Sequence, residues 1–100
     1  MKVTLLYFDH CPNWVETDQH LTRLQAEIPN LETVRQRVET PEDAERLGFR
    51  GSPSILINGV DPFANTDAPV GLSCRIHTTP SGPAGSPTFN QLRDALANHA

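Results

Sequence analysis

The sequence predicts a single α/β domain in which a central mixed sheet of four strands carries helices on both faces. Strand-like apolar runs and helical patterns alternate along the first half of the chain, which is typical of strands joined by crossover helices. A length of 100 residues is too short for two separate cores. No linker or internal repeat divides residues 1–100. The expected order of elements in this one domain is therefore βαβαββα.

The first two strands and the helix between them are indicated by their hydrophobic patterns. Residues 3–8 form a nearly continuous apolar run, which is typical of a central strand covered on both faces. Residues 13–28 carry four residues at helical spacing on one face, namely Thr17, Leu21, Leu24 and Ile28. Residues 31–38 alternate, so we expect a second strand with one largely solvated face.

Two further helix starts are marked by capping residues. Thr40 precedes a proline and has an acid three positions later, and this pattern predicts a helix over Pro41–Leu47. Thr88 and Gln91 stand at the spacing of a capping box, ahead of a stripe of apolar residues. We therefore expect a closing amphipathic helix.

The segment between these two helices contains strand and turn signals. Ser54–Ile57 is an apolar run, and it is followed by Asn58-Gly59, a pair suited to the positive backbone angles of a tight turn. Residues 61–71 are rich in turn formers and lack periodicity, so a surface loop is expected there. Residues 74–78 are expected to form the fourth strand.

Charge and composition exclude several classes of partner. The net charge is -4 and no basic cluster is present that could neutralise several phosphates, so nucleic acid is not an expected partner. The apolar stretch near the N-terminus is too short for a membrane span and meets Asp9 and His10 instead of a cleavage site. We therefore expect no membrane partner and a cytoplasmic location. In that compartment two cysteines indicate catalytic, redox or metal-binding use.

Cys11 stands directly after the first expected strand, before Pro12 and the first expected helix. Ligand sites in open sheets form beyond the carboxyl ends of parallel strands, so Cys11 is expected at the mouth of a site. A helix start favours a thiolate because unpaired N–H groups and the positive end of the dipole face it, and a protonated His10 would add to this effect. The alternative is that Cys11 is a small packing residue.

The stretch GFRGSPSILING over residues 48–59, with the first strand and Cys11 ahead of a helix, resembles the thioredoxin superfamily. In that family a cis-proline begins the third core strand beside the active-site cysteine, and Pro53 matches it. The resemblance implies a thioredoxin-like fold, a cis Ser52-Pro53 bond, and a cleft where Ser52, Pro53 and Trp14 contact a substrate. Thioredoxins carry a second cysteine where this chain has Trp14, so exchange between adjacent cysteines is excluded.

The second cysteine, Cys74, follows the long loop and is introduced by GLSC. The distant pair Cys11 and Cys74 is similar to the core of alkylmercury lyases, a thioredoxin-like region that uses two distant cysteines and an aspartate. The resemblance implies that Cys74 lies close enough to Cys11 for a disulfide or a shared soft ion, and residues 60–73 are long enough to cross back over the sheet edge. The alternative is a tight hairpin after the third strand, which would leave Cys74 at the far end of the sheet, about 15 to 20 Å from Cys11. That family's aspartate stands where this chain has Trp14, so only the two cysteines carry over.

Two functional hypotheses of different class follow. In the first, the chain is a small cytosolic thiol-redox protein with Cys11 as the thiolate nucleophile. Cys74 is then a distant resolving thiol or a second ligand for a soft, mercury-type metal. The partners would be a small-molecule thiol, a soft metal, or a protein thiol or disulfide, with no cofactor and no resident metal. In the second, the chain is a non-catalytic thioredoxin-like module whose cleft beside Pro53 and Trp14 binds a peptide or a partner protein. Trp14 either lines that cleft or covers the core. A further alternative is a protein related to alkylmercury lyases.

Overall fold

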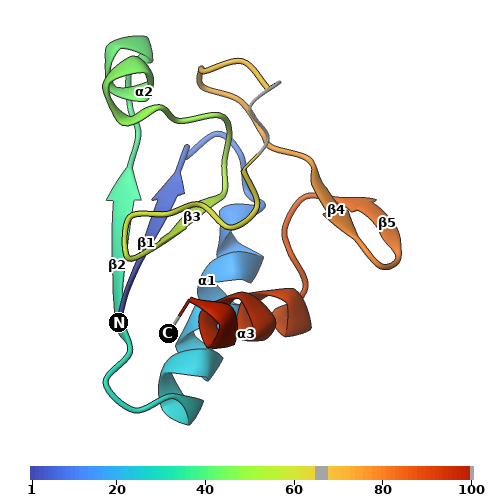
Figure 1. Cartoon of the computed structure of the whole chain (residues 1–100). Helices are drawn as coiled ribbons and strands as arrows, with labels where there is room; N and C mark the ends of the chain where they lie inside the picture. The colour runs from blue at the N-terminus through green and yellow to red at the C-terminus, as the bar shows by residue number, and fades with distance from the viewer. Residues whose placement is uncertain (65–67, 100) are drawn as a thin grey trace.

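The chain folds into a mixed α/β structure, obtained as a computed structural model that describes residues 1–64 and 68–99 (Figure 1). Three helices and five strands lie within these residues. In chain order they are β1 (Lys2–Tyr7), α1 (Trp14–Glu27), β2 (Glu32–Arg37), α2 (Pro41–Leu47), β3 (Ser54–Ile57), β4 (His77–Thr79), β5 (Gly82–Ala84) and α3 (Phe89–Asn98). None of the helices in this part of the chain is long and apolar enough to cross a membrane.

The main sheet has the strand order β2-β1-β3. β1 pairs with β2 in parallel and with β3 antiparallel, so the expectation of a mixed sheet with a central first strand is confirmed. The Ser52-Pro53 peptide bond immediately before β3 is cis, as the resemblance implied. Asn58 and Gly59 both adopt positive φ angles and close the expected tight turn after β3, where Ile57 and Val60 exchange backbone hydrogen bonds.

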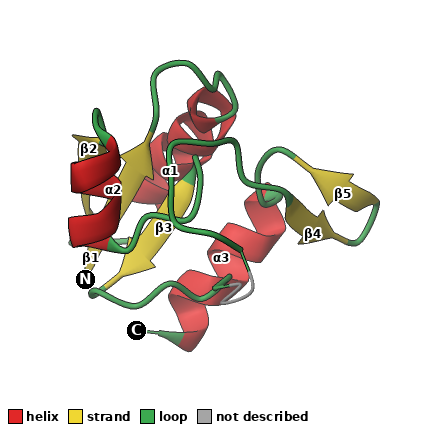
Figure 2. Cartoon of the chain, turned by 90° about the horizontal axis from the view of Figure 1, so that it is seen from above, coloured by secondary structure: helices red, strands yellow, loops and turns green. Residues whose placement is uncertain are grey.

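Helices cover both faces of this sheet, and β1 contributes apolar side chains to both faces. Val3 and Leu5 pack with α1 and α3 in one core cluster, whereas Leu6 belongs to a second cluster with Ala44 of α2 and Phe49. Figure 2 shows the sheet between α2 on one side and α1 and α3 on the other. The apolar run of β1 is therefore buried from both sides, as its sequence indicates.

The capping residues act as expected. The Thr40 hydroxyl accepts a hydrogen bond from the Asp43 backbone N–H at the start of α2. At α3, Thr88 and Gln91 form a complete capping box, each side chain accepting from the backbone N–H of the other residue. Local hydrogen bonds thus start both helices at the residues that the sequence indicates.

The expectation that residues 74–78 form a fourth strand of the main sheet is wrong. Among the described residues the main sheet has three strands, and β4 pairs with β5 in a separate hairpin. The cause is local: the Thr79 hydroxyl accepts from the Ser81 N–H and donates to the Gly82 carbonyl, which closes a turn directly after β4. Pro80, Ser81 and Gly82 were the sequence signal for this turn.

Candidate functional site

Cys11 lies in a turn after β1, three positions before α1 begins at Trp14. Its backbone N–H donates to the Phe8 carbonyl at 3.0 Å. The residue is 0% exposed, so the expectation that Cys11 sits open at the mouth of a site is wrong. The chain folds back over this turn from a distant segment.

Cys74 belongs to this distant segment and forms a disulfide with Cys11 across a sequence separation of 63 residues. The two Cα atoms lie 5.6 Å apart, inside the roughly 7 Å limit that a disulfide requires. The expectation that the long loop returns Cys74 to Cys11 is therefore confirmed. Cys74 itself is exposed, in contrast to its partner.

Backbone hydrogen bonds fix the position of Cys74 beside the start of β3. The Ser52 N–H donates to the Ser73 carbonyl at 2.8 Å, and the Arg75 N–H donates to the Ser52 carbonyl at 2.9 Å. These two bonds form an isolated parallel bridge between Ser52 and Cys74. The backbone next to Pro53 therefore holds the second cysteine in place from both sides.

Arg75 anchors the same segment through its side chain. The guanidinium lies 2.7 Å from the Asp61 carboxylate and also donates to the Phe63 carbonyl. Arg75 is 7% exposed, so it is a buried cation with a charged partner and a backbone acceptor. Neither Arg75 nor Asp61 was predicted as a site residue, because an arginine after a cysteine and an aspartate in a loop carry no signal of pairing.

Gly51 allows this segment to approach the sheet closely. Its φ of +119° lies in the region that favours glycine. A Cβ atom at this position would lie 2.9 Å from the Arg75 Cβ and 3.0 Å from the Arg75 Cα. Only a residue without a side chain fits between β3 and the segment that carries Cys74.

His77, two residues after Arg75, is buried and contacts Pro53. Its Nε2 donates to the Pro53 carbonyl at 3.0 Å, and its ring meets Phe63 edge-on. Burial lowers the pKa of His77 below its ordinary value of 6.5, and the nearby Arg75 charge acts in the same direction. The Pro53 carbonyl thus accepts a hydrogen bond from a neutral imidazole.

The other expected substrate contacts, Ser52 and Trp14, differ in their burial. Ser52 is fully buried beside the disulfide. Trp14 is partly buried, packs against the core cluster of α1 and α3, and stacks at 4.4 Å between ring centroids on Tyr7. These contacts favour the core role for Trp14, and its contact with a substrate stays a prediction.

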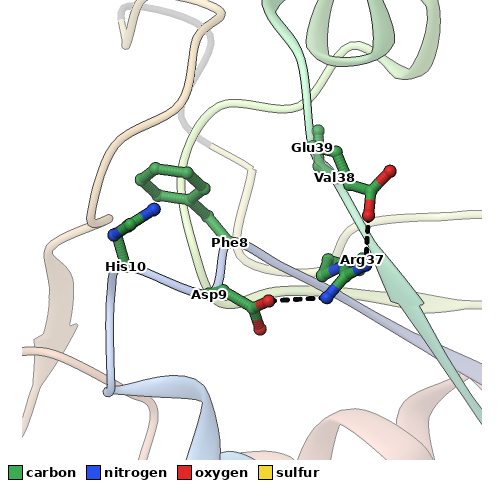
Figure 3. A pocket seen from close by; sticks show the side chains of 6 residues that line it. All are labelled: Phe8, Asp9, His10, Arg37, Val38 and Glu39. Carbon is green, nitrogen blue, oxygen red and sulfur yellow. Dashed lines mark hydrogen bonds and ion pairs between the residues drawn. The ribbon is translucent and has the colours of Figure 1, made fainter.

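One surface hollow includes Cys74, and another includes the residues directly before Cys11. One, of about 250 Å³, has Cys74 in its wall together with Arg50, Arg75 and Ile76. The other, of about 260 Å³, lies at the carboxyl ends of β1 and β2 and is lined by Phe8, Asp9, His10, Arg37, Val38 and Glu39. Figure 3 shows the Arg37 side chain hydrogen-bonded to both Asp9 and Glu39, so its charge is already neutralised there.

The Cys11–Cys74 pair can carry out thiol–disulfide chemistry. When oxidised, the pair can accept two electrons; when reduced, it presents two thiols in reach of each other. Within residues 1–64 and 68–99, no group of three or more histidine, cysteine or acidic side chains is gathered as a metal site.

Comparisons with known proteins add no relative. A scan against protein-family models, a search of curated proteins and a search of solved structures each found no match to this chain.

Proposed function

We propose that the protein is a thiol–disulfide oxidoreductase that cycles between a Cys11–Cys74 disulfide and two free thiols. The observation that carries this proposal is the way the two cysteines are brought together. The Ser52 backbone bonds, the Arg75–Asp61 ion pair and the close approach at Gly51 all hold Cys74 in place without needing the disulfide. A pair held at such a distance by other contacts reforms its bond readily after reduction.

We further propose that the fold is a smaller version of the thioredoxin-like architecture. The β1-α1-β2 unit, the cis Pro53 before an antiparallel β3, and the closing helix α3 support this assignment. The separate β4–β5 hairpin departs from the four-stranded pattern. A cytoplasmic location suits the proposal, since a cycling disulfide works where thiol reductants are present.

The test is redox titration of the purified chain in glutathione buffers, followed by peptide mapping. The wild-type protein is expected to show a reversible Cys11–Cys74 link in the monomer, and to accelerate exchange between glutathione and a small aromatic disulfide. The matched control is the double variant Cys11→Ser, Cys74→Ser, which keeps the fold's other contacts. A wild-type rate no higher than that of the double variant would sink the enzymatic proposal and leave a binding module.

A second candidate function, soft-metal capture, uses the same two sulfurs. Two thiolates held side by side suit a soft ion that accepts linear coordination, such as mercury. Titration of the reduced protein with Hg(II) should consume both thiols at one ion per chain, whereas each single-cysteine variant should bind more weakly. Equal affinity in wild-type and single-cysteine proteins would rule out a shared site.

A further inference from the structure

We infer that Cys74 is the sulfur at which external thiols exchange, and that Cys11 is its buried internal partner. The inference rests on the proposed function and assigns the two roles within it. It reverses the order that sequence position favours, since Cys11 stands at the strand end near a helix. Three features of the site support this assignment.

The first feature is access. An attacking thiolate has to reach one sulfur of the disulfide, so exposure decides which one reacts. Cys11 is 0% exposed, whereas Cys74 is exposed and forms part of the wall of the hollow of about 250 Å³. A hollow of this size next to Cys74 admits the end of a small-molecule thiol.

The second feature is that the cover over Cys11 does not depend on the disulfide. Ser52 holds both neighbours of Cys74 through backbone hydrogen bonds, and the Gly71 N–H donates to the Phe49 carbonyl at 3.0 Å. Val70 and Leu72 pack against the core cluster beside α2. Residues 70–75 therefore stay docked after reduction, and Cys11 stays shielded.

The third feature is the environment of the Cys11 sulfur. The Cys11 Sγ lies 3.7 Å from the Ser52 carbonyl oxygen. That oxygen can accept a hydrogen bond from a protonated thiol, but it repels a thiolate, and burial disfavours the thiolate further. In the reduced protein Cys11 is thus kept as a thiol, and exposed Cys74 supplies the nucleophile.

The exchange steps balance under this assignment. During reduction, a small-molecule thiolate attacks the Cys74 Sγ, the disulfide bond breaks, and its electron pair passes to the Cys11 Sγ, which takes up a proton. A second thiolate attacks the sulfur of the bound small molecule, which leaves as a symmetrical disulfide and frees Cys74 as a thiolate. The two small thiols together supply the two electrons.

The test is a brief alkylation of the fully reduced wild-type protein with limiting iodoacetamide, followed by peptide mapping. Cys74 is expected to be modified at least ~10-fold faster than Cys11, and unfolding in urea should remove the difference. Faster or equal modification of Cys11 in the folded protein would overturn the assignment. This measurement needs no substitution, so it does not depend on a variant that folds.

Matched single variants give an independent readout. With glutathione disulfide, Cys11→Ser should accumulate a stable mixed disulfide at Cys74, whereas folded Cys74→Ser should form little at Cys11. Wild-type protein that cycles in redox buffers but reacts first at Cys11 would refute this inference and leave the proposed function standing. A reactive Cys74 in a protein that does not accelerate exchange would support the assignment of Cys74 but refute the proposed function.

Discussion

At the scale of single residues, His77 shows how burial changes an ordinary side chain. It is 4% exposed and faces Pro53, Phe63 and the charged pair of Arg75 and Asp61. Burial and the Arg75 charge oppose protonation of His77, and they outweigh the Pro53 carbonyl and the Asp61 charge, which favour it. The imidazole is therefore neutral in the folded protein at neutral pH.

This environment predicts that the folded protein loses stability in acid through His77. The folded pKa lies below the unfolded value of 6.5, so the contribution is fully present above that value. It is lost as pH falls toward the folded pKa, because only the unfolded chain takes up the proton. In that window the free energy of unfolding should fall by up to about 1.4 kcal/mol per pH unit.

Urea denaturation between about pH 5 and 8 measures this effect, since histidine is the side chain that ordinarily titrates there. His77→Gln keeps a donor that can reach the Pro53 carbonyl and removes the titration, so its curve should be flatter than the wild-type curve. His10→Gln, which alters an exposed imidazole, is the control and should keep the wild-type slope. A wild-type slope in His77→Gln would assign the acid sensitivity to other groups.

At the scale of elements, the segment that carries Cys74 docks on the start of β3 through backbone contacts, and Gly51 sets their separation. An alanine at Gly51 would require φ of +119° and would press its Cβ on the Arg75 backbone. Either the strand start or the segment has to shift. The Cys11–Cys74 geometry would then change without any alteration of a cysteine.

We predict that Gly51→Ala lowers the free energy of unfolding more than Gly82→Ala does, by about 1–3 kcal/mol. Gly82 has a similar φ of +109° but nothing within 4 Å of its would-be Cβ, so it isolates the backbone strain from the close contact. Urea unfolding of both oxidised variants gives the comparison. Disulfide formation from the reduced protein should also be slower than in the wild-type protein for Gly51→Ala, but not for Gly82→Ala. Equal losses in the two variants would show that the segment adapts at no cost.

At the scale of the whole molecule, the disulfide ties the first turn of the chain to its second half. The bond closes a loop with a sequence separation of 63 residues. Such a closure restricts the unfolded chain far more than the folded one, where other contacts already join the two segments. Redox state and stability are therefore coupled.

We predict that reduction lowers the free energy of unfolding by about 2–4 kcal/mol while the fold persists. Urea unfolding with and without reductant measures this, and circular dichroism in the absence of urea reports whether the reduced chain stays folded. The double variant Cys11→Ser, Cys74→Ser should be insensitive to reductant. Peptide mapping should first show that the disulfide is broken. If the free energy of unfolding of the wild-type protein is then unchanged, the coupling is contradicted.

Several features of this protein were readable from the sequence because their causes are local. The β1 run, the α1 periodicity and the capping residues Thr40 and Thr88 depend on neighbours within one or two turns. The Asn58-Gly59 turn follows from backbone angles that few residues adopt. The cis bond at Pro53 and the meeting of Cys11 with Cys74 were implied by resemblance to known families, and the structure shows both.

Other features depended on contacts between distant parts of the chain, so no spacing in the sequence could reveal them. Cys11 is buried because Cys74 returns over it, and Cys74 stays there because Gly51 admits the Arg75 backbone and Arg75 meets Asp61. Such packing is decided by three-dimensional fit and by the need to pair a buried charge. The sequence located the two cysteines; the tertiary structure decided which of them faces solvent.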